Sequence, residues 1–157
     1  MIGLDETDRK ILWYLQYDAR LTNKELADKL GKSVTPVYER IRKLEREGFI
    51  KRYVALVDRQ KAGISLLAYT NVQLKEHSYQ MLKAFEKAVV KLEEVMECNH
   101  MTGSYDYLLK IAVPDMQAYQ DFIINKLSRL ANIGTVQSSF VMTEIKQETA
   151  FHLGRHA

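Results

Sequence analysis

The chain has almost no cysteine: a single residue of this type, Cys98, occurs among its 157 residues. An intramolecular disulfide is therefore excluded, and this cysteine usage favours a reducing compartment, so we expect a cytoplasmic protein. Because 46% of the residues are hydrophobic, a chain of this length can bury one core or two small ones.

Long hydrophobic runs are also missing. No stretch approaches the roughly 20 consecutive apolar residues that a membrane-spanning helix needs. The first ten residues, MIGLDETDRK, are too polar and acidic for a secretory signal peptide. The sequence thus predicts no membrane partner.

The sequence motifs of common enzymes and metal sites are missing as well. The sequence contains no glycine-rich phosphate loop, no nucleophile elbow and no HExxH motif, so it predicts no catalytic residue and no cofactor. The four histidines lack the spacing of metal ligands, and no metal site is predicted at His77, His100, His152 or His156.

A large excess of one charge is missing from the chain as a whole, since its formal net charge is only +3. The excess that exists is local. Residues 29–52 hold eight Lys/Arg and three Glu, a net charge of +5, whereas residues 61–157 hold ten residues of each sign. A basic patch confined to one segment is typical of a surface that contacts nucleic-acid phosphates.

The basic segment lies in a pattern of two short helices joined by a glycine turn, residues 21–50. Thr22 followed three residues later by Glu25 is a capping box that begins the first helix, and Gly31 ends it. Ser33 is the N-cap candidate of the second helix. Two packed helices of this kind form a helix-turn-helix, whose second helix fits the major groove of duplex DNA.

The second helix of this pair has an apolar and a polar face. The apolar face is predicted from residues that recur at helical spacing: Val34, Val37, Ile41 and Leu44. At ~100° per residue, the opposite face carries Thr35, Glu39, Arg42, Lys43 and Arg46. Arg42 and Arg46 repel each other at this spacing, which favours a polyanion as the partner of the face. Glu39 has two open interpretations, a contact to a cytosine base or an ion pair with Lys43.

The pattern of the chain changes near residue 60. An amphipathic helix over residues 5–17 precedes the helical pair, and residues 50–57 (IKRYVALV) are predicted to form a strand, which gives a winged or strand-extended helix-turn-helix. The expected division of the chain is a helix-turn-helix domain over 1–50, a strand and linker over 51–64, a second domain over 65–148 and a C-terminal tail over 149–157.

The second domain alternates strand and helix patterns. Strands are expected over residues 67–74, 95–102, 105–113 and 136–145, and helices over residues 79–92 and 115–130. The order β-α-β-β-α-β is the ferredoxin-like arrangement, so the predicted fold class is α+β with a four-stranded antiparallel sheet. Because the helices cover one face of such a sheet, a second copy of the chain is the simplest cover for the other.

These motifs together resemble the Lrp/AsnC (feast/famine) family of transcriptional regulators over nearly the whole chain. The motifs that carry the resemblance are LDETDRKIL, DARLTNKELADKLGKSVTPVYERIRKLEREGFI, ECNHMTGSYDYLLKIAVPDMQAYQDFI and SSFVMTEIK. One departure is Val34, where many members have proline; its side chain is expected to face inward, with little effect on DNA docking. The resemblance implies a non-enzymatic, sequence-specific regulator that binds double-stranded DNA. It further implies that an amino acid or related small metabolite changes the oligomeric state or the DNA affinity.

The resemblance also implies which residues contact DNA. Groove or base-edge contacts fall on Ser33, Thr35, Tyr38, Glu39 and Arg42, and phosphate contacts fall on Arg40, Lys43 and Arg46. Members of the family bind DNA as dimers, so a homodimer that assembles further, to an octamer, is expected.

The expected effector pocket lies at the turn TGSYD, which consists of Thr102, Gly103, Ser104, Tyr105 and Asp106. Gly103 lets backbone amides approach a carboxylate, and Asp106 can accept an ammonium group, so the turn suits both charges of an amino acid. From the residues alone, a plain hairpin turn in which Asp106 bonds nearby amides is the simpler interpretation. The resemblance favours the pocket, and implies that three residues of the last strand line it: Gln137, Ser138 and Ser139.

An enzymatic alternative stays open at this point. Siroheme decarboxylases look like this family and keep both domains, and their polycarboxylate tetrapyrrole substrate would need cationic or histidine residues in the pocket. Near the TGSYD turn this chain offers only His100 and Lys110, so the regulator is favoured over a tetrapyrrole decarboxylase.

Overall fold

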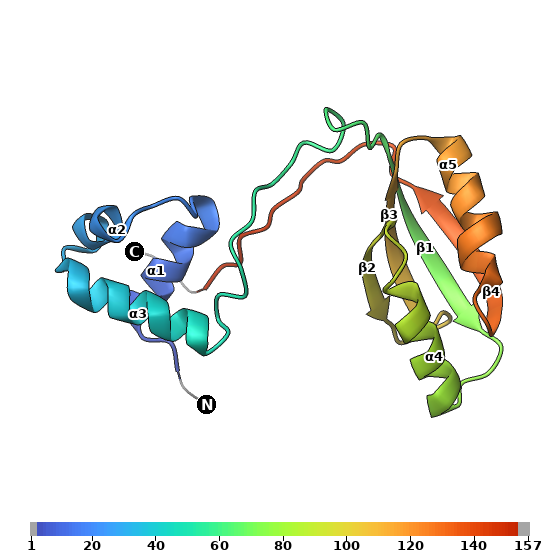
Figure 1. The fold of residues 1–157 in the computed structure, drawn as a ribbon, viewed down its shortest axis with the longest axis horizontal. Helices are drawn as coiled ribbons and strands as arrows, with labels where there is room; N and C mark the ends of the chain where they lie inside the picture. Colours follow the sequence, from blue (N-terminus) through green and yellow to red (C-terminus); the bar gives the residue numbers. More distant parts are fainter. Residues whose placement is uncertain (1–2, 154–157) are drawn as a thin grey trace. The chain divides into compact units, whose positions relative to one another are not determined.

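The computed structural model describes residues 3–153, which form two compact units. Of these residues, the first unit comprises 3–56 together with 146–153, and the second comprises 57–145. The first is helical and the second contains the sheet (Figure 1). Each has a hydrophobic core of its own, as the length and composition allow.

The first unit consists of α1 (Glu6–Tyr17), α2 (Asn23–Leu30) and α3 (Val34–Arg46). The predicted capping box begins α2: Glu25 N donates to Thr22 Oγ1 at 3.2 Å, and Thr22 N donates to Glu25 Oε2 at 2.7 Å. α2 ends at Gly31, whose φ of 63° is left-handed. These local signals separate α2 from α3, and the predicted helix-turn-helix is confirmed.

Apolar side chains of all three helices meet in the core of the first unit. Its buried members are Ile11, Leu12, Leu26, Ala27, Val37, Ile41 and Leu44. Val34 was expected to face inward with the apolar stripe of α3, and this is wrong, because its side chain is 44% exposed. Val34 is the first residue of the helix, one turn before the point where α3 meets the other helices.

The second unit has the element order β1 (Leu66–Leu74), α4 (Tyr79–Val89), β2 (Val95–His100), β3 (Tyr107–Val113), α5 (Met116–Asp121) and β4 (Ile133–Phe140). All paired strands are antiparallel, in the spatial order β2-β3-β1-β4. α4 and α5 lie on the same face of this sheet (Figure 1). The predicted ferredoxin-like arrangement is therefore confirmed.

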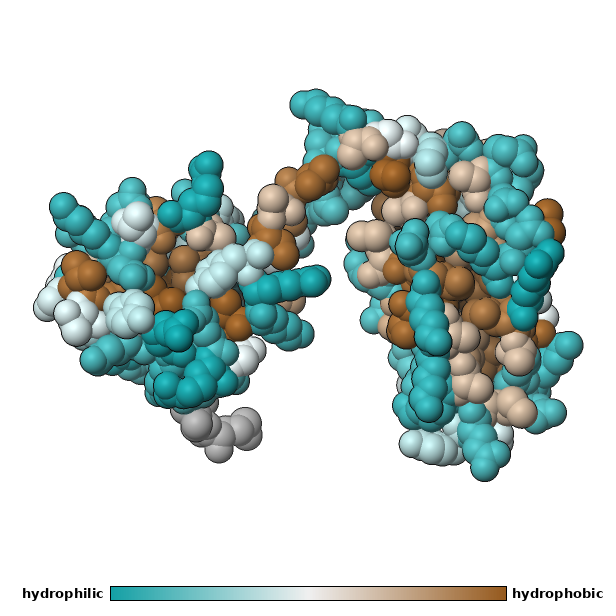
Figure 2. All heavy atoms as spheres, viewed as in Figure 1, coloured by the Kyte–Doolittle hydropathy of each residue, from teal (hydrophilic) through white to brown (hydrophobic). Residues whose placement is uncertain are grey.

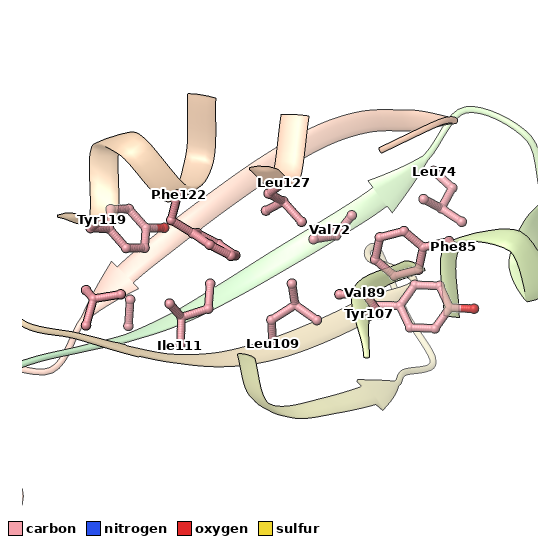
Figure 3. Close-up of a cluster of buried hydrophobic side chains, with 12 residues drawn as sticks. Val72, Leu74, Phe85, Val89, Tyr107, Leu109, Ile111, Tyr119, Phe122 and Leu127 are labelled. Carbon is pink, nitrogen blue, oxygen red and sulfur yellow. The ribbon is translucent and has the colours of Figure 1, made fainter. Parts of the chain in front are cut away.

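The core of the second unit lies between the sheet and its helices. Phe85 of α4 packs against Tyr107 of β3 with ring centroids 4.6 Å apart, and Phe122 and Leu127 approach the sheet from the segment after α5 (Figure 3). Alternate residues of β3, beginning with Tyr107, are buried. The residues between them, such as Lys110, lie on the opposite face, which no helix of the unit covers.

Three expected elements differ from the structure. The last strand, expected over residues 136–145, is β4 over Ile133–Phe140, because its backbone pairs with β1 only up to Phe140. Residues 50–57 are not a strand, because no other described segment forms a strand ladder with their backbone. Apolar side chains there, such as Leu56 and Val57, are exposed. Figure 2 shows hydrophobic residues at the surface of the segment that connects the two units. The expected helix over 115–130 changes geometry after α5, into a π-helical turn over Phe122–Lys126 and a 3-10 turn over Leu127–Arg129.

The last described residues return to the helical unit. Arg9 Nη1 donates to the carbonyl oxygen of Leu153 at 2.7 Å, and the Leu153 side chain packs against the helical core. Phe151 N donates to Gln16 Oε1 at 2.7 Å, and Gln16 Nε2 donates back to the Phe151 carbonyl at 3.2 Å. The segment expected as a separate tail thus contacts α1 through residue 153. His156 lies outside the described residues.

Candidate DNA-binding surface and effector pocket

The outer face of α3 carries most of the residues expected to contact DNA. Six of them are exposed: Ser33, Thr35, Tyr38, Glu39, Arg42 and Arg46. Lys43 is half-buried, and Ser33 is the N-cap of α3 without a side-chain capping hydrogen bond. This face is the only side of the helix left open by the core, so groups that touch a groove have to come from it.

Arg40 lies elsewhere. Its Nη1 donates to Asp8 Oδ1 at 2.7 Å and to Asp5 Oδ2 at 2.5 Å, both at the beginning of α1. Asp5 is also the N-cap of α1, and the amide N–H that Asp8 donates to it is the first cause that lowers the pKa of the Asp5 carboxyl group; Arg40 lowers it further. In this arrangement the Arg40 guanidinium joins α3 to α1, whereas Arg42 and Arg46 are exposed.

The TGSYD turn connects β2 to β3 and is bent by Gly103, whose φ is 114°. Thr102, Gly103 and Ser104 are exposed, and Tyr105 and Asp106 are half-buried. Backbone bonds hold the end of the turn: Met101 N donates to the Asp106 carbonyl oxygen, and Asp106 N donates to the Val72 carbonyl oxygen.

The Asp106 carboxylate is bonded to the segment after β1. Leu74 N donates to Asp106 Oδ2 at 2.7 Å, and His77 Nε2 lies 3.0 Å from both carboxylate oxygens. Asn132 holds the other side of this segment, since its Oδ1 accepts from Glu76 N at 2.9 Å. An ammonium group at Asp106 would therefore share the carboxylate with His77.

The three candidate residues of β4 lie on different faces of the sheet. Gln137 accepts a hydrogen bond from the Tyr105 hydroxyl, so these two predicted pocket residues lie together. Ser138 points to the helix-covered side, where its hydroxyl contacts Thr70 at 3.2 Å and also bonds the hydroxyl of Tyr119. Ser139 alternates with Ser138 and is exposed.

Sequence reasoning missed His77, Asn132 and Tyr53 as residues near the candidate sites. His77 and Asp106 are 29 residues apart in the sequence, and no motif joins them. Tyr53 bonds Glu45 of α3 although it lies in the segment predicted as a strand.

Within residues 3–153, no group of three or more His, Cys, Asp and Glu side chains could hold a metal ion, and no helix is long and apolar enough to cross a membrane.

Two family models match the chain. One is described as a winged helix-turn-helix DNA-binding domain and matches residues 4–51, and the other is described as the Lrp/AsnC ligand binding domain and matches residues 67–151. Leucine-responsive regulatory proteins of Klebsiella pneumoniae and Escherichia coli strain K12 are each 43% identical over 144 residues, which cover 92% of this chain and 88% of theirs.

Solved structures agree over nearly the full length. A transcriptional regulator from Neisseria meningitidis, solved as a complex with L-Met, superposes with a TM-score of 0.91 at 36% identity, covering 96% of this chain and 97% of that chain. An AsnC family transcriptional regulator from Agrobacterium tumefaciens gives a TM-score of 0.90 at 39% identity, with the same coverage. The chain belongs to the Lrp/AsnC family of DNA-binding transcriptional regulators.

Proposed function

We propose that this protein is a transcriptional regulator that reads a specific duplex DNA sequence with α3 and whose DNA affinity or assembly changes when an amino acid binds near the TGSYD turn. The observation that carries the DNA-binding half is the outer face of α3. Thr35, Arg42 and Arg46 are exposed together there, in the one segment of the chain with a strong basic excess.

Selection of duplexes from fragmented genomic DNA tests the DNA-binding half. The full-length protein should enrich a defined set of fragments, and its affinity for them should fall steeply as salt is raised. Thr35→Ala is expected to relax the preference at one base pair, whereas Arg46→Ala is expected to weaken all duplexes alike. A protein that enriches no fragment above the input library at moderate salt would contradict the proposal.

The effector half of the proposal is supported by the chemistry of the turn. Gly103 leaves backbone amides open to a ligand carboxylate, and Asp106 offers a carboxylate to the ammonium. The Neisseria relative, solved with L-Met, shows that an amino acid is a ligand of a similar protein. Gln137, next to the Tyr105 hydroxyl, is proposed to contact the ligand side chain or carboxylate.

A thermal-shift measurement against each of the twenty amino acids tests this half. One or a few of them should raise the melting temperature of wild type, because a ligand that binds only the native state stabilises it. Asp106→Asn should abolish the shift, and Ser138→Ala should leave it in place, since Ser138 faces the other side of the sheet. The same amino acids should alter the sedimentation profile or the affinity for the enriched fragments.

The uncovered face of the sheet supports a homodimer, with further assembly to the octamer implied by the family. The helices occupy one face, and the other carries Tyr69 of β1 among residues that no helix of the unit covers. Light scattering at several concentrations should give an even-numbered assembly. A monomer at every concentration would contradict this part of the proposal without affecting DNA recognition by single α3 helices.

The tetrapyrrole decarboxylase alternative needs free cationic groups near the turn. Lys110 Nζ is paired with Glu97 at 2.9 Å, and the His100 ring stacks on Tyr107 with centroids 4.8 Å apart. Neither observation favours a polycarboxylate ligand, so we do not propose this activity. A tetrapyrrole absorbance band that copurifies with the protein would reverse the ranking.

A further inference from the structure

The carboxylate of Glu45, in the last turn of α3, accepts hydrogen bonds from two side chains, one on α3 and one in the segment that follows it. Its Oε1 accepts a hydrogen bond from the Tyr53 hydroxyl at 3.0 Å, and its Oε2 accepts from Arg42 Nη1 at 3.1 Å. Arg42 lies on the exposed outer face of α3, which is the proposed DNA-binding surface, whereas Tyr53 belongs to the segment that follows α3 toward residue 57. Glu45 therefore bonds both side chains.

Glu45 and its two hydrogen-bond partners lie next to a common hollow. Arg42, Glu45 and Tyr53 border a hollow of about 270 Å³ in the helical unit. Its other lining residues are Leu15, Ala19, Leu21, Asn23, Leu26, Tyr38 and Ile41, most of them apolar. Partial burial, followed by the contact with Glu45, raises the pKa of Tyr53 to about 12, so the phenol stays protonated and remains a donor at neutral pH.

The bond from Arg42 to Glu45 leaves most of the guanidinium available. Arginine has five N–H donors in a planar fork, and the structure uses one of them for Glu45. The Arg42 side chain is 64% exposed and the Glu45 side chain 30%. A carboxylate that accepts from one side of the guanidinium orients the whole group. The N–H donors on the other side can then bond a guanine base or a phosphate.

A carboxylate at this place also has a cost for DNA binding. Glu45 is an anion next to the proposed phosphate-facing surface, and anions repel the phosphate backbone. If Glu45 served only as a surface charge, its loss would strengthen every DNA complex and change no base preference. If it aims Arg42, its loss raises affinity for arbitrary DNA and lowers discrimination at the base that Arg42 reads.

We propose that Glu45 is a positioning residue for Arg42, and that the Tyr53 hydroxyl sets the position of Glu45. This inference rests on the proposed function, because it concerns the DNA contact of α3. It goes beyond that function by stating how the segment after α3 affects the orientation of Arg42. A movement of residues 50–57 withdraws Tyr53, frees one oxygen of Glu45 and changes the direction of Arg42. The recognition helix itself does not have to move.

The test uses a duplex selected from a random library by the full-length wild-type protein, together with an unrelated duplex of equal length. Tyr53→Phe removes only the hydroxyl and should weaken the selected duplex by about three- to tenfold while leaving the unrelated duplex within twofold. The loss should occur at the same base pair as in Arg42→Ala, and the double variant should bind like Arg42→Ala alone. Tyr17→Phe, at an exposed tyrosine of α1, is the matched control and should bind as wild type does.

Glu45→Gln supplies a second readout that a purely structural role would not move. It should raise affinity for the unrelated duplex and lower the ratio between selected and unrelated duplexes, because repulsion and aiming are lost together. Unfolding followed by the fluorescence of the single tryptophan, Trp13, verifies that each variant is folded.

The outcomes separate this inference from the proposed function. If Tyr53→Phe binds as wild type does, the proposed coupling of Tyr53 to Arg42 is wrong. The same holds if Tyr53→Phe lowers affinity equally in the presence and absence of the Arg42 side chain. Neither result affects the proposed function as a DNA-binding regulator. If wild type enriches no duplex at all, the proposed function is overturned and this inference with it.

Discussion

Arg40 of α3 lies 2.7 Å from Asp8 of α1, whose side chain is only 5% exposed. Asp8 belongs at the same time to the capping box of α1, in which its amide donates to Asp5 Oδ1 at 2.8 Å. A single arginine therefore connects the third helix to the beginning of the first. The sequence predicts a phosphate contact for Arg40, and the structure shows that its guanidinium also has internal partners in α1.

Replacement of Arg40 by alanine should destabilise the helical unit. The nearly buried carboxylate of Asp8 would lose its cationic partner, and because Arg40 itself is partly exposed, we expect a loss of about 1–2 kcal/mol in the free energy of unfolding. Urea unfolding followed by Trp13 fluorescence measures it.

Arg46→Ala is the matched control for Arg40→Ala. Arg46 is exposed on the outer face of α3, so its loss should leave the unfolding midpoint nearly unchanged and reduce the slope of log affinity against log salt by about 1. If Arg40→Ala instead lowers only the salt slope and leaves stability intact, the internal role of Arg40 is wrong.

Acid should unfold the helical unit through its capping carboxylates. The pKa of Asp5 is lowered, first by the Asp8 amide, and the pKa of Glu25 is lowered, first by the Thr22 amide. A lowered native pKa contributes stability that is present above the unfolded pKa and is lost as pH falls through the native pKa. Stability should therefore decrease from about pH 4.5 downward.

The urea midpoint, recorded by Trp13 fluorescence as a function of pH, measures this loss. Asp5→Asn keeps a side chain that caps helices, so the variant should still fold at pH 7 and should show a shallower acid dependence than wild type. Equal slopes in the two proteins would rule out Asp5 as a contributor.

Leu153 should stabilise a domain that lies far from it in the sequence. Its side chain packs against the core of the helical unit and its carbonyl oxygen accepts from Arg9. Leu153→Ala is expected to lower the free energy of unfolding of that unit by about 1 kcal/mol, because the side chain is only half-buried.

Phe151 is the control for Leu153, since its side chain is 77% exposed while its backbone bonds Gln16. Phe151→Ala should keep these backbone bonds and the wild-type midpoint. Two variants with the same midpoint would show that the Leu153 side chain adds nothing.

Gly134 should not accept a side chain. A Cβ at this position would lie 2.9 Å from the carbonyl oxygen of Gln73, at the place where the pairing of β1 with β4 shifts register. Gly134→Ala is expected to cost about 1–3 kcal/mol in the sheet unit, seen as a lower melting temperature by circular dichroism. Gly3→Ala meets no atom within 4 Å and should melt as wild type does.

The amino-acid sequence alone predicted the elements whose causes are local. The capping box of Thr22 and Glu25, the left-handed Gly31 and the alternation along β3 each depend on residues within a few positions of one another. The order of strands and helices then led to the ferredoxin-like sheet, because few topologies satisfy that order. The segment over 50–57 failed as a strand since a strand also needs a partner, which its own composition cannot supply.

The tertiary structure decided the interactions that join distant parts of the chain. Arg40 turned toward Asp8, Asp106 bonded His77, Ser138 separated from Gln137, and the residues around 151–153 returned to α1. The sequence shows the type and charge of these side chains, and the helical and strand periods show their faces. Which groups then meet depends on how the elements pack, because a side chain takes whichever partner the fold brings within hydrogen-bond distance.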